Sequence, residues 1–376
     1  MRRLTYCTNI HPGESWADVR SNLEGHLLAV KADVSSEETF PIGLRVSGQA
    51  VREIDDDEAR RFYAWCEDHG TYVLTINAFP HGQFHGVSVK ERVYDPDWRD
   101  PERVEYTNRV ADRLVEWLPE GAPGSISTVP IAWRSSFAEE DWAVACRNVH
   151  AVLEHLDALA QKSGKAIVLA FEPEPGCVVE KTEEAIELFD RLAVPESRAR
   201  LAGLCFDCCH QAVEFEDPVS SFGRLLDAGI PIGKVQVSSS LRACGEEIAD
   251  LISFDEPTYL HQVVARDESG RLHRAADLPE FFGPAQRGRA DQGVRLVEAR
   301  VHFHVPVFAE HLGRCGTTRF FLEELLPNLD ESIPLEVETY SFDVLPAELR
   351  RESVAKSIAR ELQWVQQRYD APNRRS

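Results

Sequence analysis

The feature that most constrains the fold of this 376-residue chain is an alternation of short apolar runs with amphipathic stretches. Runs such as Ala166–Glu172 are almost uninterrupted, which is typical of parallel strands buried on both faces. The stretches between the runs repeat apolar residues at helical spacings of three and four. The predicted strands are Leu4–Ile10, Ile42–Val46, Tyr72–Asn77, Ser125–Pro130, Ala166–Glu172, Leu201–Asp207, Gly233–Ser238 and Pro334–Glu338, and clear helices are Asp55–His69, Trp142–Lys162, Thr182–Leu192 and Glu348–Tyr369.

Eight strands alternating with helices predict an α/β fold, a (β/α)8 TIM barrel. The chain has 376/8 = 47 residues per unit, whereas a bare barrel needs about 250 residues in all. We therefore expect insertions after strand three, at about 80–101, and after strand seven, at about 241–300, the second with a hairpin around Tyr259–Leu272. Both would lie at the C-terminal ends of the strands, where barrels keep their active sites. Residues 1–370 would form a single domain and 371–376 a frayed tail.

The main structural alternative is a doubly wound open sheet. That fold usually carries a glycine-rich phosphate loop after its first strand. The corresponding segment here reads TNIHPGESW and has a single glycine, which favours the barrel.

Composition excludes several classes of protein. Lys and Arg number 41 against 63 Asp and Glu, a net charge of −22 that disfavours nucleic-acid binding. No apolar segment is long enough for membrane insertion, and the start of the chain lacks the apolar region of a secretory signal. Nine cysteines, an odd number spread along the chain, indicate free thiols in a reducing compartment. We expect a cytoplasmic protein.

Carboxylates end three of the apolar runs in the second half of the predicted barrel. Glu172 ends AFE, Asp207 ends the sixth run with His210 three residues later, and Glu336 and Glu338 end the eighth. Buried carboxylates are costly unless they are paired or bind a cation, and carboxylates converging from three strand ends would repel one another. An oxygen-rich site with one or two imidazoles suits Mn, Mg, Co or Zn.

These motifs resemble the xylose isomerase-like superfamily of TIM barrels, the sugar isomerase and epimerase class, in which D-x-x-H on the sixth strand is a hallmark. Within it, the chain is similar to the EboE-type metabolite traffic proteins. The segments that carry this closer similarity, spread over essentially the whole chain, are YCTNIHPGESW, FPHGQFHG, VKERVYDPDW, EPEPGC, FDCCHQAVEFED, KVQVSSSL, VHFHVPVF and LEVETYSF.

The resemblance implies a divalent metal, which could be Mn, Co, Zn, Fe or Mg, held by residues at the ends of strands five to eight. The matching positions are Glu172, Asp207 and Glu338, with His210 facing substrate or metal. Strand seven departs from the pattern, because Gln236 stands where a ligand histidine is usual. Either Gln236 or, from the inserted segment, His302 or His304 would fill that position; a two-residue spacing puts both histidines on one face of a strand.

The resemblance also implies proton transfer next to a carbonyl, with Glu172 and Glu338 as the acid and base, and Glu174 as a reserve. Further expected substrate contacts are His11, His81, His85, Glu174 and His302, the 81–85 segment acting as a lid. Each assignment has a structural alternative: the carboxylates could bond loop amides, Asp207 could cap the next helix, and the histidines could lie in turns or surface loops. Cys208 and Cys209, expected to point to opposite faces of a strand, are predicted to be packing residues.

The sequence leaves several functions open. The leading one is a metal-dependent isomerase or epimerase acting on a small metabolite, linked by the EboE resemblance to processing or export of a secondary metabolite precursor. A barrel that binds and passes on a metabolite without turnover is the alternative. An apurinic-site endonuclease is less favoured, because of the charge of −22. Barrels of this superfamily often form homo-oligomers, so a homo-oligomer is a further expectation.

Overall fold

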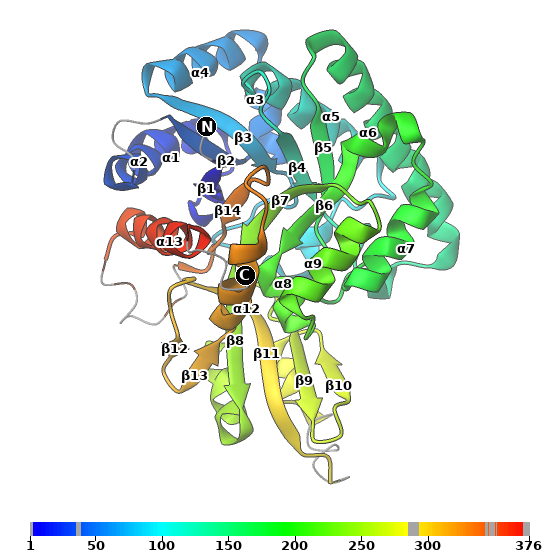
Figure 1. Cartoon of the computed structure of the whole chain (residues 1–376), viewed down its shortest axis with the longest axis vertical. Helices are drawn as coiled ribbons and strands as arrows, with labels where there is room; N and C mark the ends of the chain where they lie inside the picture. Colours follow the sequence, from blue (N-terminus) through cyan, green and yellow to red (C-terminus); the bar gives the residue numbers. More distant parts are fainter. Residues whose placement is uncertain are drawn as a thin grey trace.

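The computed structural model describes residues 3–34, 39–284, 293–342, 345, 350 and 352–370. Its larger part is a barrel of eight parallel strands, in the order β1-β14-β7-β6-β5-β4-β3-β2, which confirms the predicted (β/α)8 fold (Figure 1). The barrel strands are β1 (Leu4–Tyr6), β2 (Phe40–Arg45), β3 (Thr71–Asn77), β4 (Gly124–Thr128), β5 (Ile167–Phe171), β6 (Ala202–Asp207), β7 (Ile232–Val237) and β14 (Leu335–Val337).

The barrel closes between its first two strands. A parallel bridge joins Cys7 to Gly43, and the Thr5 hydroxyl donates to the carbonyl of Pro41 at 2.7 Å while accepting from the Gly43 N–H. The predicted first strand, Leu4–Ile10, was too long: β1 ends at Tyr6, and the chain forms a 3₁₀ turn at Thr8–Ile10. This early turn brings the segment after β1 across the C-terminal end of the barrel, where Asn9 reaches Glu338.

Helices cover the outside of the barrel. Capping explains several of their ends: Asp55 accepts a hydrogen bond from the N–H of Glu58 at the start of α4, and Gly164 ends α6 at φ 75°. The predicted last helix begins later than expected, at Val354; residues 346–349 and the tail 371–376 lie outside the described part of the chain. The helices around the barrel are α1 (Trp16–Asn22), α2 (Leu28–Val34), α3 (Gly48–Glu53), α4 (Asp56–Asp68), α5 (Pro101–Trp117), α6 (Trp142–Ser163), α7 (Thr182–Leu192), α8 (Cys208–Val213), α9 (Pro218–Asp227), α12 (Arg319–Leu325) and α13 (Val354–Tyr369); α10 (Leu278–Phe281) instead packs against β10 (Leu272–Ala275), away from the barrel.

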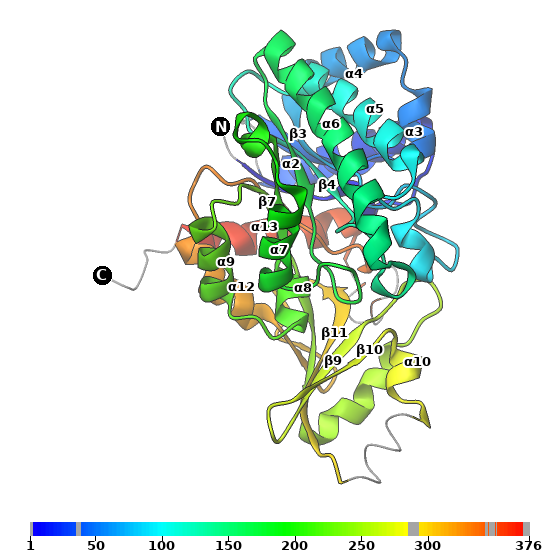
Figure 2. The ribbon, with the colours of Figure 1, turned by 90° about the vertical axis from the view of Figure 1, so that its right-hand side faces the viewer.

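A second sheet follows β7 and extends away from the barrel (Figure 2). Its order is β10-β9-β11-β8-β13-β12, with antiparallel pairing throughout. It has its own apolar core, and Phe308 and Phe342 pack against both this core and that of the barrel. The segment expected at about 241–300 lies within this sheet, whose strands are β8 (Ser239–Cys244), β9 (Val263–Asp267), β10 (Leu272–Ala275), β11 (Leu296–Val305), β12 (His311–Leu312) and β13 (Cys315–Thr317).

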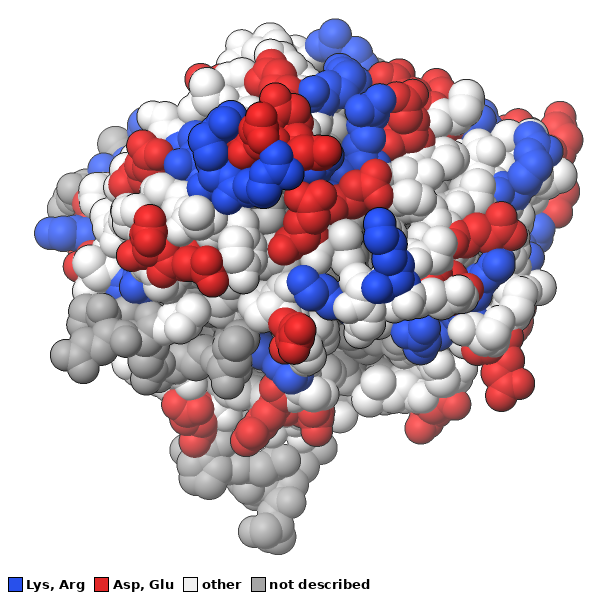
Figure 3. All heavy atoms as spheres, turned by 90° about the horizontal axis from the view of Figure 1, so that it is seen from above, with Lys and Arg blue, Asp and Glu red and all other residues white. Residues whose placement is uncertain are grey.

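Three global expectations can be compared with the structure. The nine cysteines are all free thiols. Among the described residues, every helix is too short or too polar to cross a lipid bilayer. On the face of the barrel seen in Figure 3, Lys and Arg side chains are interleaved with Asp and Glu instead of forming a continuous basic strip.

Candidate metal and active site

Three carboxylates meet at the C-terminal end of the barrel. Glu172 directly follows β5, Asp207 is the last residue of β6, and Glu338 directly follows β14. One oxygen of each lies within 4.8 Å of the others, and all three side chains are buried. The strand register brings them together, because parallel strands end at one rim of the barrel.

Neighbouring polar groups orient these carboxylates. Glu338 Oε1 accepts hydrogen bonds from the amides of Asn9 and Asn77, at 2.7 and 3.1 Å. Asp207 Oδ1 accepts from the N–H of His210 and from the Ser238 hydroxyl, at 2.9 and 2.8 Å. Asp207 therefore caps α8 and faces the site at once, so the two interpretations of this residue are compatible.

Buried oxygen atoms in this group lack partners. Glu172 Oε2 and Asp207 Oδ2 have no hydrogen-bond partner among the described residues. The side-chain oxygen and nitrogen of the nearby Gln236 on β7 also lack a partner there. Unpaired buried carboxylate oxygens are costly. A divalent cation bound between Glu172, Asp207 and Glu338 satisfies these oxygens, so the residues present fit such an ion.

The local charges explain how the carboxylates titrate. Burial, reinforced by the neighbouring carboxylates, raises the pKa of Glu338 well above its usual range. Burial also raises the pKa of Glu172, although His210 opposes the rise. For Asp207, burial acts in the same direction, but the charge of His210 and the hydrogen bonds to Oδ1 outweigh it and lower the pKa.

A buried ion pair lies one layer deeper in the barrel. Lys234 Nζ on β7 lies 2.6 Å from Glu336 Oε1 on β14, and both side chains are fully buried. Burial lowers the pKa of Lys234, but Glu336, together with Cys205, Cys7 and Glu172, raises it by more, so the ammonium stays charged. This ammonium also lowers the pKa of Glu172 and of Glu338.

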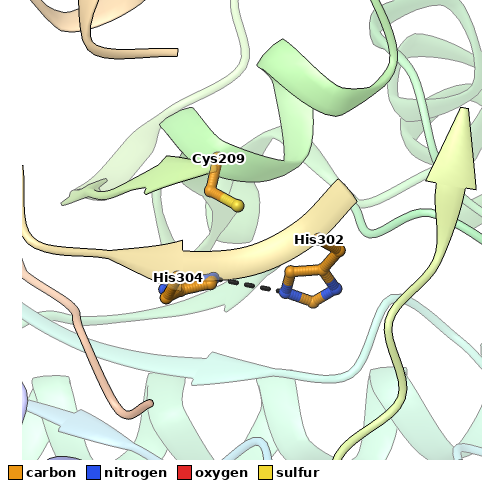
Figure 4. Close-up of side chains that lie close together, drawn as sticks. All are labelled: Cys209, His302 and His304. Atoms are coloured by element: carbon orange, nitrogen blue, oxygen red, sulfur yellow. Dashed lines mark hydrogen bonds between the residues drawn. The ribbon is translucent and has the colours of Figure 1, made fainter. Parts of the chain in front are cut away.

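Three histidines lie beside the carboxylates. His210 comes from α8, and His302 and His304 come from one face of β11 (Figure 4). His302 Nε2 lies 3.1 Å from His210 Nε2 and 3.2 Å from His304 Nε2. Burial lowers the pKa of His302 far below its usual range and that of His304 to about 4. Burial opposes protonation of His210 as well, but the carboxylates, Asp207 foremost, raise its pKa.

Glu174 joins the barrel to the second sheet. Its Oε1 accepts hydrogen bonds from the Tyr94 hydroxyl at 2.7 Å and from the Gln262 amide at 3.1 Å. Glu174, His210 and His302 also each place a ligand atom within 4.8 Å of the others. Burial raises the pKa of Glu174, against the effect of His210 and of these hydrogen bonds.

A pocket opens above the two groups. Its floor consists of the carboxylates of Glu172, Glu174 and Glu338 and the three histidines. Half of the wall residues are aromatic, and most come from the segment after β3. Tyr259 and Leu260 come from the segment before β9, so both expected insertions contribute, and Tyr340 follows β14. The wall residues are Phe79, Pro80, Phe84, Val89, Lys90, Val93, Tyr94, Tyr259, Leu260 and Tyr340, and Asn9 and Asn77 complete the lining.

Three predicted substrate-binding histidines lie outside this lining. His11 is buried, 3.0 Å from the Tyr6 hydroxyl, with its ring stacked on His26. His81 packs edge-on against Tyr106. His85 is closer, because its ring contacts the wall residues Phe84 and Tyr259. The structure thus brings Glu172, Glu174, Asp207, His210, His302, His304 and Glu338 together, with Gln236 buried nearby, and sets these three histidines apart.

The sequence interpretation missed several members of the site. Tyr94 and Gln262 hold Glu174, and Asn9 and Asn77 hold Glu338. Asn77 gave a usable signal, as a polar residue ending an apolar strand, whereas Tyr94 ends a short 3₁₀ helix and Gln262 lies just before β9. Cys208 and Cys209 are not on a strand as expected: capping by Asp207 starts α8 there, and Cys209 has its sulfur within 4.8 Å of a ring nitrogen of both His302 and His304 (Figure 4).

Comparisons with solved structures agree on the architecture. A xylose isomerase-like TIM barrel protein from Mycobacterium smegmatis in complex with magnesium has a TM-score of 0.56 at 11% identity, covering 98% of this chain and 97% of that one. An L-ribulose 3-epimerase has a TM-score of 0.51 at 11% identity, covering 98% and 95%. The IOLI protein with a bound zinc atom has a TM-score of 0.50 at 12% identity, covering 98% of both chains.

At such low identity these likenesses show the fold alone. No protein with a curated description matches this chain in sequence. The profile of one family, described as the xylose isomerase-like TIM barrel, matches residues 38–283, which is more than half of the chain. With the eight-stranded barrel, this match identifies the chain as a member of the xylose isomerase-like TIM barrel family.

Proposed function

We propose that this protein is a metal-dependent isomerase or epimerase that moves a proton next to a carbonyl of a small polyhydroxylated metabolite. One observation carries the proposal: Glu172, Asp207 and Glu338 form a buried group with unpaired oxygens on Glu172 and Asp207, and Glu172 and Glu338 line a pocket. The L-ribulose 3-epimerase among the similar structures supports this reaction class by its name.

The three carboxylates would hold the cation, with Gln236 and His304 as the neighbouring candidates named from the sequence. When bound, a divalent cation would polarise the substrate's carbonyl oxygen and so acidify the adjacent C–H. Two of the similar solved structures contain magnesium and zinc, respectively. The carboxylate oxygens of this site equally suit Mn, Co or Fe.

Glu172 and Glu338 would carry the proton. They come from β5 and β14, which are not adjacent in the barrel, so they can approach a substrate carbon from different sides. Burial raises the pKa of Glu172 to about 7 and that of Glu338 well above its usual range, so both carboxyl groups take up a proton more readily than an exposed glutamate does. Asn9 and Asn77 fix the direction of Glu338, and the apolar walls keep water from the transferred proton.

Other contacts are proposed with the substrate. His210, His302 and Glu174 line the pocket and would bind hydroxyl groups of the substrate. His85 would affect substrate binding indirectly, through its ring contacts with the wall residues Phe84 and Tyr259. His11 and His81 would contact substrate only after movement of the segments around them. The EboE-type motifs further suggest that the metabolite is a precursor processed for export.

The test is exchange of a carbon-bound proton with solvent. The protein, supplied with Mn²⁺, is incubated in D₂O with a panel of ketoses, aldoses and keto acids, and deuterium incorporation is followed by NMR. We expect incorporation into one class of compound, reduced about 100-fold or more in Glu172→Gln and in Glu338→Gln. Glu361→Gln is the matched control, since it removes a buried carboxylate that does not line the pocket, and it should retain exchange.

A compound that binds in calorimetry but never exchanges its proton would replace this proposal with the non-catalytic carrier. Retention of full exchange in both Glu172→Gln and Glu338→Gln would assign the proton transfer to other residues.

A further inference from the structure

We propose that the metabolite carries its carbonyl and hydroxyl groups at one end only, and that its other end is an uncharged apolar group, aromatic or branched. This inference rests on the proposed function for the position of the reacting end, at the floor of the pocket, and adds the class of substrate. The observation that carries it is the separation of polar and apolar side chains between the floor of the pocket and its walls.

The carboxylates, imidazoles and amides that line the pocket are gathered at its floor, where Asn9 and Asn77 both bond Glu338. Six of the ten wall residues have no side-chain nitrogen or oxygen at all. These six are Phe79, Pro80, Phe84, Val89, Val93 and Leu260. A substrate hydroxyl held against them would lose its hydration without gaining a partner, which disfavours a substrate that is polar along its whole length.

The hydroxyl groups of two wall tyrosines already serve the floor. Tyr94 donates to Glu174 Oε1 at 2.7 Å and accepts from the Gln262 amide at 2.8 Å. The Tyr340 hydroxyl lies 3.3 Å from His302 Nε2. A sugar can stack on such rings through its C–H groups, but its outer hydroxyls would still need partners. The walls therefore suit a group that makes no hydrogen bonds.

Charge disfavours a phosphate or carboxylate on the outer end of the substrate. Lys90 is the only lysine or arginine among the lining residues in the described part of the chain. Its ammonium lies 2.7 Å from Asp277 Oδ2 and 3.3 Å from the carbonyl of Glu256. An anionic group would have to compete with Asp277 for this ammonium, and the carboxylates of the floor would repel it. The outer group is therefore uncharged.

Three aromatic rings from distant segments make one side of the walls. Phe84, Tyr259 and Tyr340 pack against one another, with ring centroids 5.2, 5.0 and 5.4 Å apart. A backbone hydrogen bond ties two of the segments together, because the N–H of Val89 donates to the carbonyl of Thr258 at 2.8 Å. Such a surface gains most from burying an apolar or aromatic group.

Three α-hydroxy ketones with the same reacting end test the inference: hydroxyacetone with a benzyl group on its methyl carbon, erythrulose, and dihydroxyacetone phosphate. For the Mn²⁺-loaded protein in D₂O, NMR gives kcat/KM for deuterium incorporation, corrected for exchange without protein. We expect the benzyl compound to exceed erythrulose about 10–100-fold, because the extra hydroxyls of erythrulose stay unpaired at the walls. The phosphate should be the poorest. A value for either of these two that equals or exceeds that of the benzyl compound overturns the inference.

A substitution in the walls tests the cause of this preference. Val93→Thr adds a hydroxyl to the walls at nearly unchanged shape and should reduce the ratio of benzyl compound to erythrulose about 5-fold or more. Val87→Thr is the matched control, because Val87 belongs to the same segment but is 36% exposed and lies outside the lining. Equal ratios in the two variants would overturn the assignment of the preference to the walls.

The outcomes separate this inference from the proposed function. Fastest exchange with erythrulose overturns the inference and leaves the proposed function standing. Should none of the three compounds exchange its proton, the proposed function fails for this reacting end, and calorimetry with the same compounds and the Mn²⁺-loaded protein decides. Tightest binding of the benzyl compound then supports the inference. Equal or tighter binding of erythrulose or of the phosphate, or binding of none of the three, overturns it.

Discussion

The carboxylate group and the histidine group lie side by side but are built in different ways. Strand register brings Glu172, Asp207 and Glu338 together, because each stands at the end of a barrel strand. His302 and His304 come from the second sheet, and hydrogen bonds from their Nδ1 atoms set their directions. The barrel thus supplies a rigid layer of charge, and the second sheet supplies ligands whose position depends on how the two parts join. The predictions below separate these two kinds of construction.

The largest effect is expected from Lys234→Met, which breaks the buried pair with Glu336. Removing one partner leaves a fully buried carboxylate uncompensated, at a cost of about 3–5 kcal/mol in the free energy of unfolding. Urea denaturation measures this cost. The double variant Lys234→Met/Glu336→Gln removes both charges and should recover most of it. If the single variant lost less than about 1 kcal/mol in the free energy of unfolding, the barrel interior would tolerate an unpaired buried charge.

A pH-dependent effect is expected where α13 meets both regions. Glu361 accepts hydrogen bonds from the Thr339 hydroxyl and the Val307 N–H, at 2.7 and 3.0 Å. Burial raises its pKa to about 7. Between its unfolded pKa, about 4.3, and 7 the folded protein holds a proton that the unfolded chain has lost, so stability falls as pH rises through this window.

The loss from this group is on the order of 2–3 kcal/mol between pH 5 and 8. Denaturation of wild type and Glu361→Gln at pH 5, 6.5 and 8 isolates it, because the other carboxylates titrate in both proteins. The free energy of unfolding of Glu361→Gln should rise relative to that of the wild type as pH increases. Parallel curves for the two proteins would contradict the prediction.

Close packing of the barrel interior is tested by Gly43→Ala on β2. A Cβ at this position would lie 2.1 Å from Glu336 Oε2 and 2.6 Å from the carbonyl of Tyr6. We expect a loss of about 2 kcal/mol from overpacking, measured by thermal unfolding. Gly25→Ala is the matched control: its Cβ would meet no atom within 4 Å, so in a helical segment it should be neutral or stabilising by up to about 1 kcal/mol. Equal stability of the two variants would refute the argument.

The sequence sufficed for the barrel because its signals are local. Runs such as AIVLAF are apolar on both faces, and the structure has a strand at all eight predicted places. The carboxylates at the strand ends followed from the same pattern, since all the strands of a parallel barrel end at one rim. The end of the first strand was missed because the turn at Thr8–Ile10 serves a distant contact, that of Asn9 with Glu338.

The rest of the site depends on contacts between distant segments. Gln262 reaches Glu174 and His302 across 88 and 40 residues of sequence, and Tyr94 reaches Glu174 across 80. Nothing in the local sequence of either residue signals that role. Cys208 and Cys209 were placed on a strand because the apolar run continues through them, yet the side chain of Asp207 starts a helix at that point. Capping by a residue that also faces the site could not be read from hydrophobicity.

The smallest effect is expected at the junction between the two regions, from Arg274→Gln. Arg274 on β10 forms ion pairs with Glu214, which follows α8, and with Glu180, which precedes α7, the latter at 3.4 Å. Its side chain is 36% exposed, so solvent screens the pairs. Glu214 can also take up a proton, because burial raises its pKa to about 7. We therefore expect a global loss of about 1 kcal/mol near neutral pH.

The same substitution should act more strongly on the junction than on the whole protein. Hydrogen exchange should speed up in β9 and β10 while the barrel strands keep their protection, because only the contact between hairpin and barrel is weakened. Arg224→Gln provides the control: it breaks an exposed pair with Glu183 within the barrel part and should change stability by less than about 0.5 kcal/mol. If Arg274→Gln instead loosened the barrel strands as much as the hairpin, the second sheet and the barrel would form one cooperative unit, and the histidine group would be held as rigidly as the carboxylates.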